Sequence, residues 1–422
     1  MILENDGVEG SLRALFDAAI AAVDPAVCVP PYLEGVSLPA GRTIAVGAGK
    51  ASAAMAKAME DHWPGPVSGL VVTRYGHSCA CRDIEIIEAA HPVPDTASLD
   101  AGMRILALAK DLGPDDLLVG LFSGGASSLM ALPAPGLSLE DKKAVHRALL
   151  ASGAPITEIN KVRRHLSAIK GGRLAAAAAP ARVLSLMISD VPGDDPAVIS
   201  SGPTVADPTT FADARAVLAK YRIRAPDAVE AHLAAATIET LKPGDAALAA
   251  TESIVVGTPQ MALEAAVAEA RRRGLEPVNL GDRIEGEARE VARTMAAMAL
   301  ARPRRHPPEV LISGGETTVT VTGQGRGGRN TEFLLALALA LDGAPGIWAI
   351  ACDSDGIDGS EDNAGAMIGP DTLARARALG LDAKDHLANN DAYGVFEKLG
   401  DLVFTGPTRT NVNDFRAILI QP

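Results

Sequence analysis

The sequence repeats one local pattern along most of its length: a short β-rich run, a turn of Gly or Ser, and a helix-forming stretch. The clearest copies begin with the runs 43–46, 117–122, 183–188, 253–256, 277–280 and 347–351. Strands that alternate with helices are typical of a mostly parallel sheet with helices on both faces. Ligands bind such sheets beyond the carboxyl ends of the strands, so we expect functional groups in the turns after these runs.

The length of the chain and one interruption in its pattern predict two domains. The 422 residues exceed the usual size of one domain. Between two helix-forming stretches, the segment 236–250 carries Pro243-Gly244. We therefore predict an N-terminal domain over 1–240 and a C-terminal domain over 241–422. The predicted fold class is α/β, with two three-layer α/β/α domains, mostly parallel sheets and an interdomain cleft.

Charge and hydropathy exclude several classes of protein. A net charge of −13 argues against nonspecific binding of nucleic acid or of an anionic membrane. No apolar run reaches the roughly 18 to 20 residues of a membrane span, and the first residues are acidic where a signal peptide is basic. We expect a cytoplasmic protein with four free thiols and small-molecule substrates. Monomer and homodimer both stay open.

The first candidate anion site is GAGK (47–50), which follows a β-rich run and opens a helix-forming stretch. Backbone N–H groups at the start of a helix favour an anion, and Lys50 adds a mobile positive charge. The GxxxxGK[ST] spacing is absent, and Ser52 stands where GxGxxG has its third glycine. The alternative is a tight strand–helix turn with Lys50 in solvent.

Two further segments carry polar groups in the same kind of place. SGGASS (123–128) can cradle an anion with backbone amides and hydroxyls, or form a compact turn. The stretch 158–173 is the most basic part of this acidic chain, and some of its cations share one helical face. A solvated helix face is the alternative for that stretch.

Carboxylates follow two of the predicted strands. Asp190 comes directly after the run 183–188, where it can bind Mg²⁺ or accept a hydroxyl proton. Asp355 belongs to the acidic turn 352–359, which is out of register for an EF-hand but suits Mg²⁺ on a nucleotide phosphate. Simple surface turns are the alternative at both places.

The segment Gly323–Asn330 is the least like an ordinary turn, because it packs several glycines around Arg326 and Arg329. Glycines let a backbone approach an anion closely, and guanidinium groups can be aimed at it. We interpret this loop as an anion-binding loop of the C-terminal domain.

Taken together and in order, the motifs resemble those of the class II glycerate kinases, and the resemblance covers nearly the whole chain. They are GAGKAS (47–52), HPVPD (91–95), SGGASSL (123–129), EINKVRRHLSAIKGGRLA (158–175), SDVPGDDPAVISSGPT (189–204), SGGETTV (313–319), GGRNTE (327–332), DSDGIDG (353–359), NNDAY (389–393) and TGPTRTNVNDF (405–415). The resemblance implies a glycerate-kinase domain, then a MOFRL domain, with the active site between them. It also implies transfer of the γ-phosphoryl group of ATP to D-glycerate, giving 2-phosphoglycerate with Mg²⁺ as cofactor.

The resemblance implicates Lys50 and Arg329, which match the family pattern, and we assign both to stabilising the moving phosphoryl group. Asp190 is the candidate base or Mg²⁺ ligand, and Asp355 is a second candidate ligand. The predicted substrate- and phosphate-binding residues are Gly49, Ser123, Gly124, Gly125, Ser127, Arg326 and Asn330. Arg329 is preferred over Arg326 for contact with the transferred group.

Two other functions are weighed against kinase activity. An NAD(P)H-dependent hydroxypyruvate reductase is faintly supported by GAGKAS, and Arg74 could meet a 2′-phosphate. The acidic residue that binds a ribose is absent from Val71-Val72-Thr73, and no Arg–His pair for a 2-oxo acid is evident. A non-enzymatic sensor of sugar acids or nucleotides is the third hypothesis; it would bind without turnover.

Overall fold

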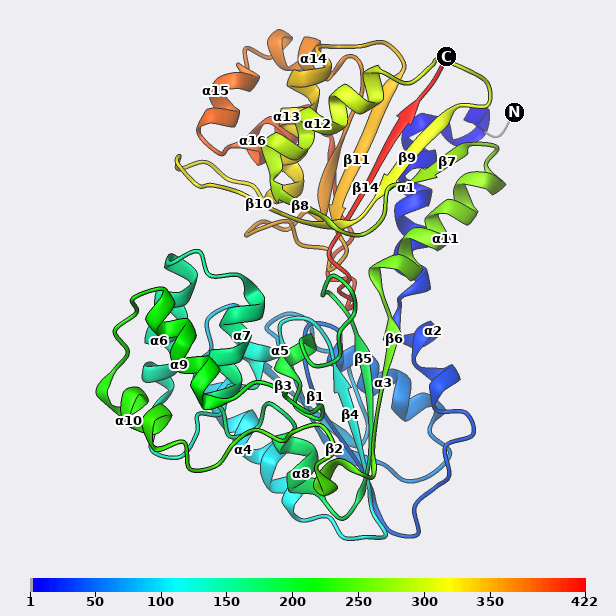
Figure 1. The fold of residues 1–422 in the computed structure, drawn as a ribbon. Helices are drawn as coiled ribbons and strands as arrows, with labels where there is room; N and C mark the ends of the chain where they lie inside the picture. Colours follow the sequence, from blue (N-terminus) through cyan, green and yellow to red (C-terminus); the bar gives the residue numbers. More distant parts are fainter. Residues whose placement is uncertain (1–2) are drawn as a thin grey trace. The chain divides into compact units, whose positions relative to one another are not determined.

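A computed structural model describes residues 3–422, and their contacts divide the chain into two compact units (Figure 1). The central unit is Pro25–Val256. The terminal unit joins the start of the chain, up to Asp24, to Gly257–Pro422. Each unit contains its own six-stranded sheet and its own buried apolar cluster.

The central sheet has the strand order β3-β2-β1-β4-β5-β6. Its strands are β1 (Thr43–Ala48), β2 (Ser68–Arg74), β3 (Ile84–Ala89), β4 (Leu117–Phe122), β5 (Arg182–Ile188) and β6 (Thr251–Gly257). The pairs β1–β2, β1–β4, β2–β3 and β4–β5 are parallel. All residues of β1 and β4 are buried, as expected for strands covered on both faces.

Helices cover both faces of this sheet, and a separate group of helices forms a second core. The helices are α2 (Pro25–Cys28), α3 (Ser52–His62), α4 (Thr96–Lys110), α5 (Ala126–Leu129), α6 (Leu139–Ala151), α7 (Ile156–His165), α8 (Arg173–Ala178), α9 (Phe211–Lys220) and α10 (Asp227–Ala235), with short 3₁₀ turns η1 (Pro30–Tyr32), η2 (Ile199–Ser201) and η3 (Ala246–Leu248). Alternate residues of β1 pack with α4 and α8. Helices α6, α7, α9 and α10 share their own apolar cluster. Asp95, Ser138 and Thr210 begin α4, α6 and α9 with side-chain caps.

The terminal sheet is mixed, with the order β13-β12-β11-β14-β9-β7 beside a two-stranded sheet of β8 and β10. Its strands are β7 (Glu276–Asn279), β8 (Ile284–Glu287), β9 (Glu309–Ser313), β10 (Gly315–Thr318), β11 (Ile347–Asp353), β12 (Gly365–Ile368), β13 (Leu402–Val403) and β14 (Asp414–Ile420). The pairs β7–β9 and β8–β10 are parallel. The pairs of β11 with β12 and β14, of β12 with β13 and of β9 with β14 are antiparallel.

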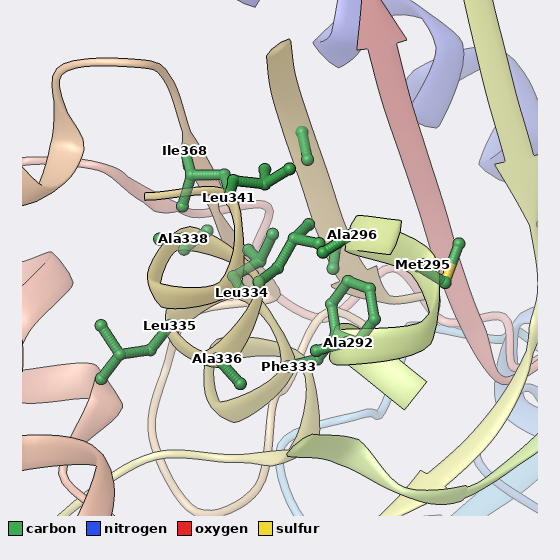
Figure 2. Close-up of a cluster of buried hydrophobic side chains, with 14 of the residues drawn as sticks. Ala292, Met295, Ala296, Phe333, Leu334, Leu335, Ala336, Ala338, Leu341 and Ile368 are labelled. Atoms are coloured by element: carbon green, nitrogen blue, oxygen red, sulfur yellow. The ribbon is translucent and has the colours of Figure 1, made fainter. Parts of the chain in front are cut away.

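Helices also cover both faces of the terminal sheet. They are α1 (Leu3–Ala22), α11 (Pro259–Arg272), α12 (Ala288–Leu300), α13 (Arg329–Leu341), α14 (Thr372–Ala378), α15 (Ala383–Ala388) and α16 (Ala392–Leu399). Figure 2 shows α13 against α12, with Phe333 directed toward Ala292 and Ala296. Nearly all of α13 is buried, which its run of Leu and Ala makes possible.

The structure confirms the α/β class and the parallel first sheet, and it differs from the prediction in three respects. The terminal sheet is mostly antiparallel, because segment 354–364 has no crossover helix and β12 therefore returns beside β11 in the opposite direction. Strand β6 belongs to the central sheet, so the predicted boundary at 240/241 falls too early. Helix α1 packs on α11 in the terminal unit. The predicted interdomain cleft stays a prediction.

Candidate active site

The central sheet changes winding direction between β1 and β4, and the two loops that leave these strands are joined. The Lys50 N–H donates to the Gly124 carbonyl at 2.9 Å, and the Ala51 N–H donates to Ser123 Oγ at 2.9 Å. The carboxyl ends of neighbouring strands flank a crevice at such a switch point, and ligands bind there in open α/β sheets. GAGK and SGGASS therefore form one site edge rather than two separate turns.

Glycine is required where these loops meet. A Cβ on Gly49, at φ +141°, would lie 2.1 Å from Ser123 Oγ. A Cβ on Gly125, at φ +86°, would lie 3.5 Å from Lys50 Cγ and 3.1 Å from His91 Nε2. The stem of Lys50 and the ring of His91 therefore both lie close to Gly125. His91 is in the HPVPD segment but was not among the predicted site residues.

The start of α5 leaves backbone donors open. Within residues 3–422, no hydrogen bond uses the N–H groups of Gly124, Gly125 or Ser127. Ser127 Oγ lies 2.8 Å from Ser201 Oγ, so the Ser127 hydroxyl is directed toward the loop that contains Ser201. Open N–H groups beside a lysine suit a phosphate or a carboxylate.

Asp190 follows β5 at the same edge of the sheet. Strand β5 pairs in parallel with β4, so its carboxyl end lies beside the SGGASS loop. The neighbouring Ser189 Oγ accepts from the Val191 N–H at 3.1 Å and fixes the turn. Asp190 is half-buried there. The structure thus brings Lys50, Asp190 and the loop 123–128 to one edge of the central unit.

The backbone of the loop Gly323–Asn330 is used differently from the prediction. Five consecutive N–H groups donate, over 2.8–3.1 Å, to acceptors in the segment 389–391. The donors are Thr322, Gly323, Gln324, Gly325 and Arg326, and the acceptors are side-chain or backbone oxygens of Asn389, Asn390 and Asp391. These amides already have partners within the protein and cannot also wrap an anion, whereas the anion-binding role predicted for the loop's arginines stays a prediction.

The glycines of this loop are needed for close packing within the protein. A Cβ on Gly323 would lie 2.1 Å from the Asn389 carbonyl oxygen, and one on Gly325 would lie 2.3 Å from Asp391 Cβ. These are distances that no side chain tolerates. The glycine signal was correctly recognised as a close approach, but the partner is the NNDAY segment.

Arg326 and Arg329 have different surroundings. Arg326 is half exposed, pairs with Glu397 at 2.9 Å and Glu361 at 3.3 Å, and stacks on the Tyr393 ring at 4.6 Å. A phosphate would have to displace these contacts to reach its guanidinium. The phosphate-binding role predicted for Arg326 stays a prediction.

Arg329 opens α13 and binds three carboxylates at once. Its Nε lies 2.7 Å from Asp414, one Nη lies 2.9 Å from Asp353, and the other lies 3.0 Å from Glu316. Burial alone lowers the pKa of Arg329, but these carboxylates outweigh it and hold that pKa well above its usual range. The side chain keeps 24% of its surface exposed, so a permanently charged, rigidly oriented guanidinium faces outward in part.

Asn330 and Asp355 lie deeper in the terminal unit. Asn330 is fully buried, and its Nδ2 donates to Asp414 at 2.8 Å. Asp355 is buried too and accepts from the Ile357 N–H at 2.8 Å. Asp358 accepts from the N–H groups of Asn330 and Thr331 and so caps α13. Asn330 thus contacts the Arg329 network through Asp414, and its predicted role in binding substrate stays a prediction.

The predicted Mg²⁺ site depends on single carboxylates. Among residues 3–422, no group of three or more His, Cys, Asp or Glu side chains could hold a metal ion. Asp190 and Asp355 belong to different units. Mg²⁺ in phosphoryl-transfer sites is held by substrate phosphates plus one or two carboxylates, and the half-buried Asp190 fits that donor set.

The basic stretch is not a solvated helix face. It forms α7 and the turn after it, and Asn160, Arg164, His165 and Lys170 are buried. The sequence indicated a cationic helix, but a helix wheel alone cannot show that a helical subdomain covers it. No helix of the described residues is long and apolar enough to cross a membrane.

Most of the chain is similar to known protein families. Residues 11–234 match a domain of unknown function, DUF4147, and residues 309–414 match the MOFRL family. A protein of Agrobacterium vitis that is provisionally named a hydroxypyruvate reductase is 56% identical over 97% of this chain and 94% of its own length.

A D-glycerate 2-kinase of Thermotoga maritima is 40% identical over 94% of this chain and 94% of its own length. The crystal structure of glycerate kinase from the same organism superposes with a TM-score of 0.86, covering 96% of this chain and 98% of that one, at 40% identity. The similarity in sequence and in fold therefore extends over nearly the whole chain.

Proposed function

The chain belongs to the class II glycerate kinase family with a C-terminal MOFRL domain, and from that premise we propose that it is an ATP-dependent D-glycerate 2-kinase. The observation that supports this most strongly is the edge of the central sheet. There Lys50 lies beside Gly125, and the amides of Gly124, Gly125 and Ser127 are open. A lysine next to open amides at a winding switch suits a phosphate-bearing substrate.

Phosphoryl transfer of this kind requires no covalent intermediate on the protein. A hydroxyl oxygen of D-glycerate attacks the γ-phosphorus of ATP, the bond to the β,γ-bridging oxygen breaks, and ADP leaves with that electron pair. The hydroxyl proton passes to a base, for which we propose Asp190. Negative charge spreads over the transferred oxygens, and we assign its stabilisation to Lys50 and Arg329.

The surroundings of the two cations support these roles separately. Lys50 carries an ammonium group on a long four-carbon stem at the carboxyl edge of the central sheet, which suits a point charge directed at the moving phosphoryl group. Arg329 is fixed by three carboxylates and partly exposed, which suits a preorganised donor that costs no reorientation. Gly49, Ser123 and Ser127 shape the edge that positions the substrates.

Magnesium and ATP belong to the same proposal. When bound, Mg²⁺ would neutralise charge on the β- and γ-phosphate oxygens. Asp190 is the residue we propose as its ligand, and Asp355 the second candidate. We propose a cytoplasmic enzyme with small-molecule substrates; monomer and homodimer both stay open.

The reductase name carried by the Agrobacterium vitis relative makes the second function worth testing. The strand order 3-2-1-4-5-6 is one that dinucleotide-binding sheets share. However, β2 ends in Thr73 and Arg74, where a dinucleotide site for NAD needs an acidic residue for the ribose. Ser52, at the third glycine position, is fully buried and lies 3.4 Å from Ser123 Oγ.

One pair of assays separates the two functions. The enzyme is incubated with D-glycerate, ATP and Mg²⁺, and separately with hydroxypyruvate and NADH or NADPH. We expect ADP and 2-phosphoglycerate in the first and no oxidation of nicotinamide in the second. Phosphorus NMR of the product distinguishes 2- from 3-phosphoglycerate. Nucleotide binding without turnover in either assay would leave the sensor hypothesis standing instead.

A further inference from the structure

Four basic side chains gather in the central unit without a carboxylate partner. Lys142 and His146 lie on α6, Arg163 lies on α7, and Lys170 lies in the turn after α7. An Arg163 Nη donates to His146 at 3.0 Å, and Lys142 Nζ donates to the Leu132 carbonyl at 3.4 Å. Within residues 3–422, none of the four forms an ion pair with Asp or Glu. We call them the basic cluster.

The neighbouring arginine shows what a structural cation looks like in the same helix. Arg164 pairs with Asp207 at 2.9 Å, and both side chains are buried. Arg163 precedes it in the chain and is also largely shielded, yet its donors meet only Asn160 and His146. Buried charges are ordinarily paired, because desolvation is otherwise uncompensated. An unpaired cluster in a protein of net charge −13 therefore needs another explanation.

Near neutral pH the cluster keeps the charge of Arg163, and a bound anion would favour protonation of its two lysines. Burial, with Arg163 nearby, lowers the pKa of His146 to about 4, so that its ring is neutral and can accept from Arg163. Burial lowers the pKa of Arg163 to about 10, which leaves it charged. Burial and the charge of Arg163 lower the pKa of Lys142 to about 7. The same causes lower the pKa of Lys170.

Hydrogen bonds connect the cluster to the site edge. Lys170 is 1% exposed, and its Nζ donates to the Ser200 carbonyl at 3.3 Å. Ser200 Oγ in turn donates to the Ser123 carbonyl at 3.2 Å. A second path runs from Arg163 through Asn160 and Ser201 to Ser127. The basic cluster thus lies within two or three hydrogen bonds of the loop that meets Lys50.

The segment that connects the cluster to the site edge has a strained backbone, which its surroundings hold in place. Ser200, Ser201 and Gly202 all have positive φ, at 57°, 61° and 60°. Two consecutive serines in the left-handed region cost free energy and persist only where the surroundings impose them. Here that conformation directs the Ser200 carbonyl to Lys170 and the Ser201 hydroxyl to Asn160.

We propose that Lys142, Arg163 and Lys170 bind the phosphate groups of the nucleotide that are not transferred, with His146 orienting Arg163. The proposal rests on the proposed kinase function. A single carboxylate, such as that of glycerate, would leave most of this positive charge uncompensated, whereas adjacent phosphates match it. The cluster and Lys50 would then lie along one polyphosphate.

Binding without turnover tests the proposal. Pyrophosphate, ADP, D-glycerate and 2-phosphoglycerate are titrated separately into the wild-type enzyme and into Lys142→Gln and Lys170→Gln by calorimetry. Lys143→Gln is the matched control, because Lys143 is adjacent on α6 but pairs with Glu140 at 3.0 Å. We expect each cluster variant to lose about tenfold or more in affinity for pyrophosphate and ADP, and the control to lose none.

The remaining outcomes are equally decisive. Unchanged pyrophosphate and ADP affinity in both cluster variants overturns the proposal, as does a loss confined to D-glycerate or to 2-phosphoglycerate. If the wild-type enzyme shows no glycerate phosphorylation but the cluster variants still lose pyrophosphate binding, the proposed function fails and the phosphate site stands. If turnover is normal and binding is unaffected, only the phosphate site fails.

Stability separates a binding role from a structural one. Removing an unpaired buried cation relieves its desolvation, so we expect Lys170→Met without ligand to melt no lower than the wild type. Pyrophosphate should raise the melting temperature of the wild type and not that of the variant. A ligand-free variant that melts clearly lower, with its pyrophosphate response intact, would show that Lys170 serves only the fold. If Lys142→Gln fails to fold, Lys142→Arg is measured instead. It keeps the positive charge, so its affinity for pyrophosphate and ADP should be retained.

Discussion

Two glycine-rich loops dominate the sequence, Ser123–Ser128 in the central unit and Gly323–Asn330 in the terminal unit, and they use glycine for different ends. In the first, amides stay open and Gly125 makes room for the stem of Lys50. In the second, four amides, together with that of the preceding Thr322, donate to the segment 389–391, and the glycines make room for that segment. Glycine density therefore marks close backbone approach; the hydrogen-bond partners decide whether the approach serves a ligand or the fold.

The comparison predicts that Lys50, whose stem runs beside the first loop, acts in chemistry, and that Arg329 of the second loop acts in both chemistry and stability. Lys50→Ala should therefore lower kcat about 100-fold or more while the melting temperature stays near that of the wild type. Steady-state kinetics with a thermal melt on the same preparation measures both. Near-normal kcat would remove Lys50 from the mechanism.

Arg329→Ala, unlike Lys50→Ala, should lower the stability of the protein as well as kcat. The substitution removes one of the two arginines that pair with the buried Asp414 and leaves Arg416 in place, so we expect a loss of about 1–3 kcal/mol in the free energy of unfolding together with a loss of kcat. Urea denaturation measures the first effect. Arg329→Lys is the informative second variant: it keeps the charge but cannot bind three carboxylates, so an unfolding free energy equal to that of the wild type would contradict the geometric argument.

Asn390→Ala tests the structural role of the second loop directly. Asn390 Oδ1 accepts from the N–H groups of Thr322 and Gly323, and the residue has φ +54°, which Ala tolerates poorly. We expect the unfolding free energy to fall by about 1–3 kcal/mol, with pyrophosphate affinity unchanged. If affinity falls while stability holds, the amides of this loop bind the anion after all, and the contrast between the two loops disappears.

Features that depend on residues close together in the sequence could be predicted from it, and features that depend on residues far apart could not. The turns after β1, β4 and β5 were found because a strand, a glycine and a helix start are all local signals, and parallel strands bring their ends to one edge. The family motifs identified Lys50 and Arg329. The packing of α1 on α11 and the return of β12 beside β11 depend on contacts far apart in the chain, for which a single sequence carries no local signal.

The same reasoning explains the misses at the site. The occupied amides of 322–326 and the burial of Lys170 depend on segments that lie some 65 and 30 residues away, as the partners of Gly325 and Lys170 show. The sequence shows which residues are charged or glycine, but not which residues they contact in the fold. Arg163 and Arg164 are identical neighbours in the sequence, and only the structure shows that one is paired and the other is not.

The pH dependence of anion binding sharpens the role of the basic cluster. Lys142 faces His146 on its own helix, Arg163 on α7 and Lys170 in the turn beyond, and its pKa is lowered to about 7. Its folded pKa lies below the unfolded value, so the unfolded state binds more protons above pH 7 and ligand-free stability should rise with pH there. An anion prefers the protonated lysine, so ADP affinity should fall several-fold between about pH 7.5 and 9.

Lys142→Arg provides the control for that trend, because a guanidinium stays charged throughout the range and ADP itself does not change ionisation there. We expect a flatter affinity profile in the variant. Equal slopes in the two proteins would assign the pH dependence to another group, with Lys170 the next to test.

Arg326→Ala should have the smallest effect of the series. Its side chain is half exposed, and its partners, the exposed Glu397 and the partly exposed Glu361, can be reached by water when the arginine is removed. We expect kcat within about twofold of the wild type and an unchanged affinity for ADP. A loss approaching that of Arg329→Ala would mean that Arg326 leaves Tyr393 and its glutamates to contact the substrates. Both arginines of the loop would then act on the substrates. The contrast between Arg329 as a catalytic cation and Arg326 as a surface cation would be wrong.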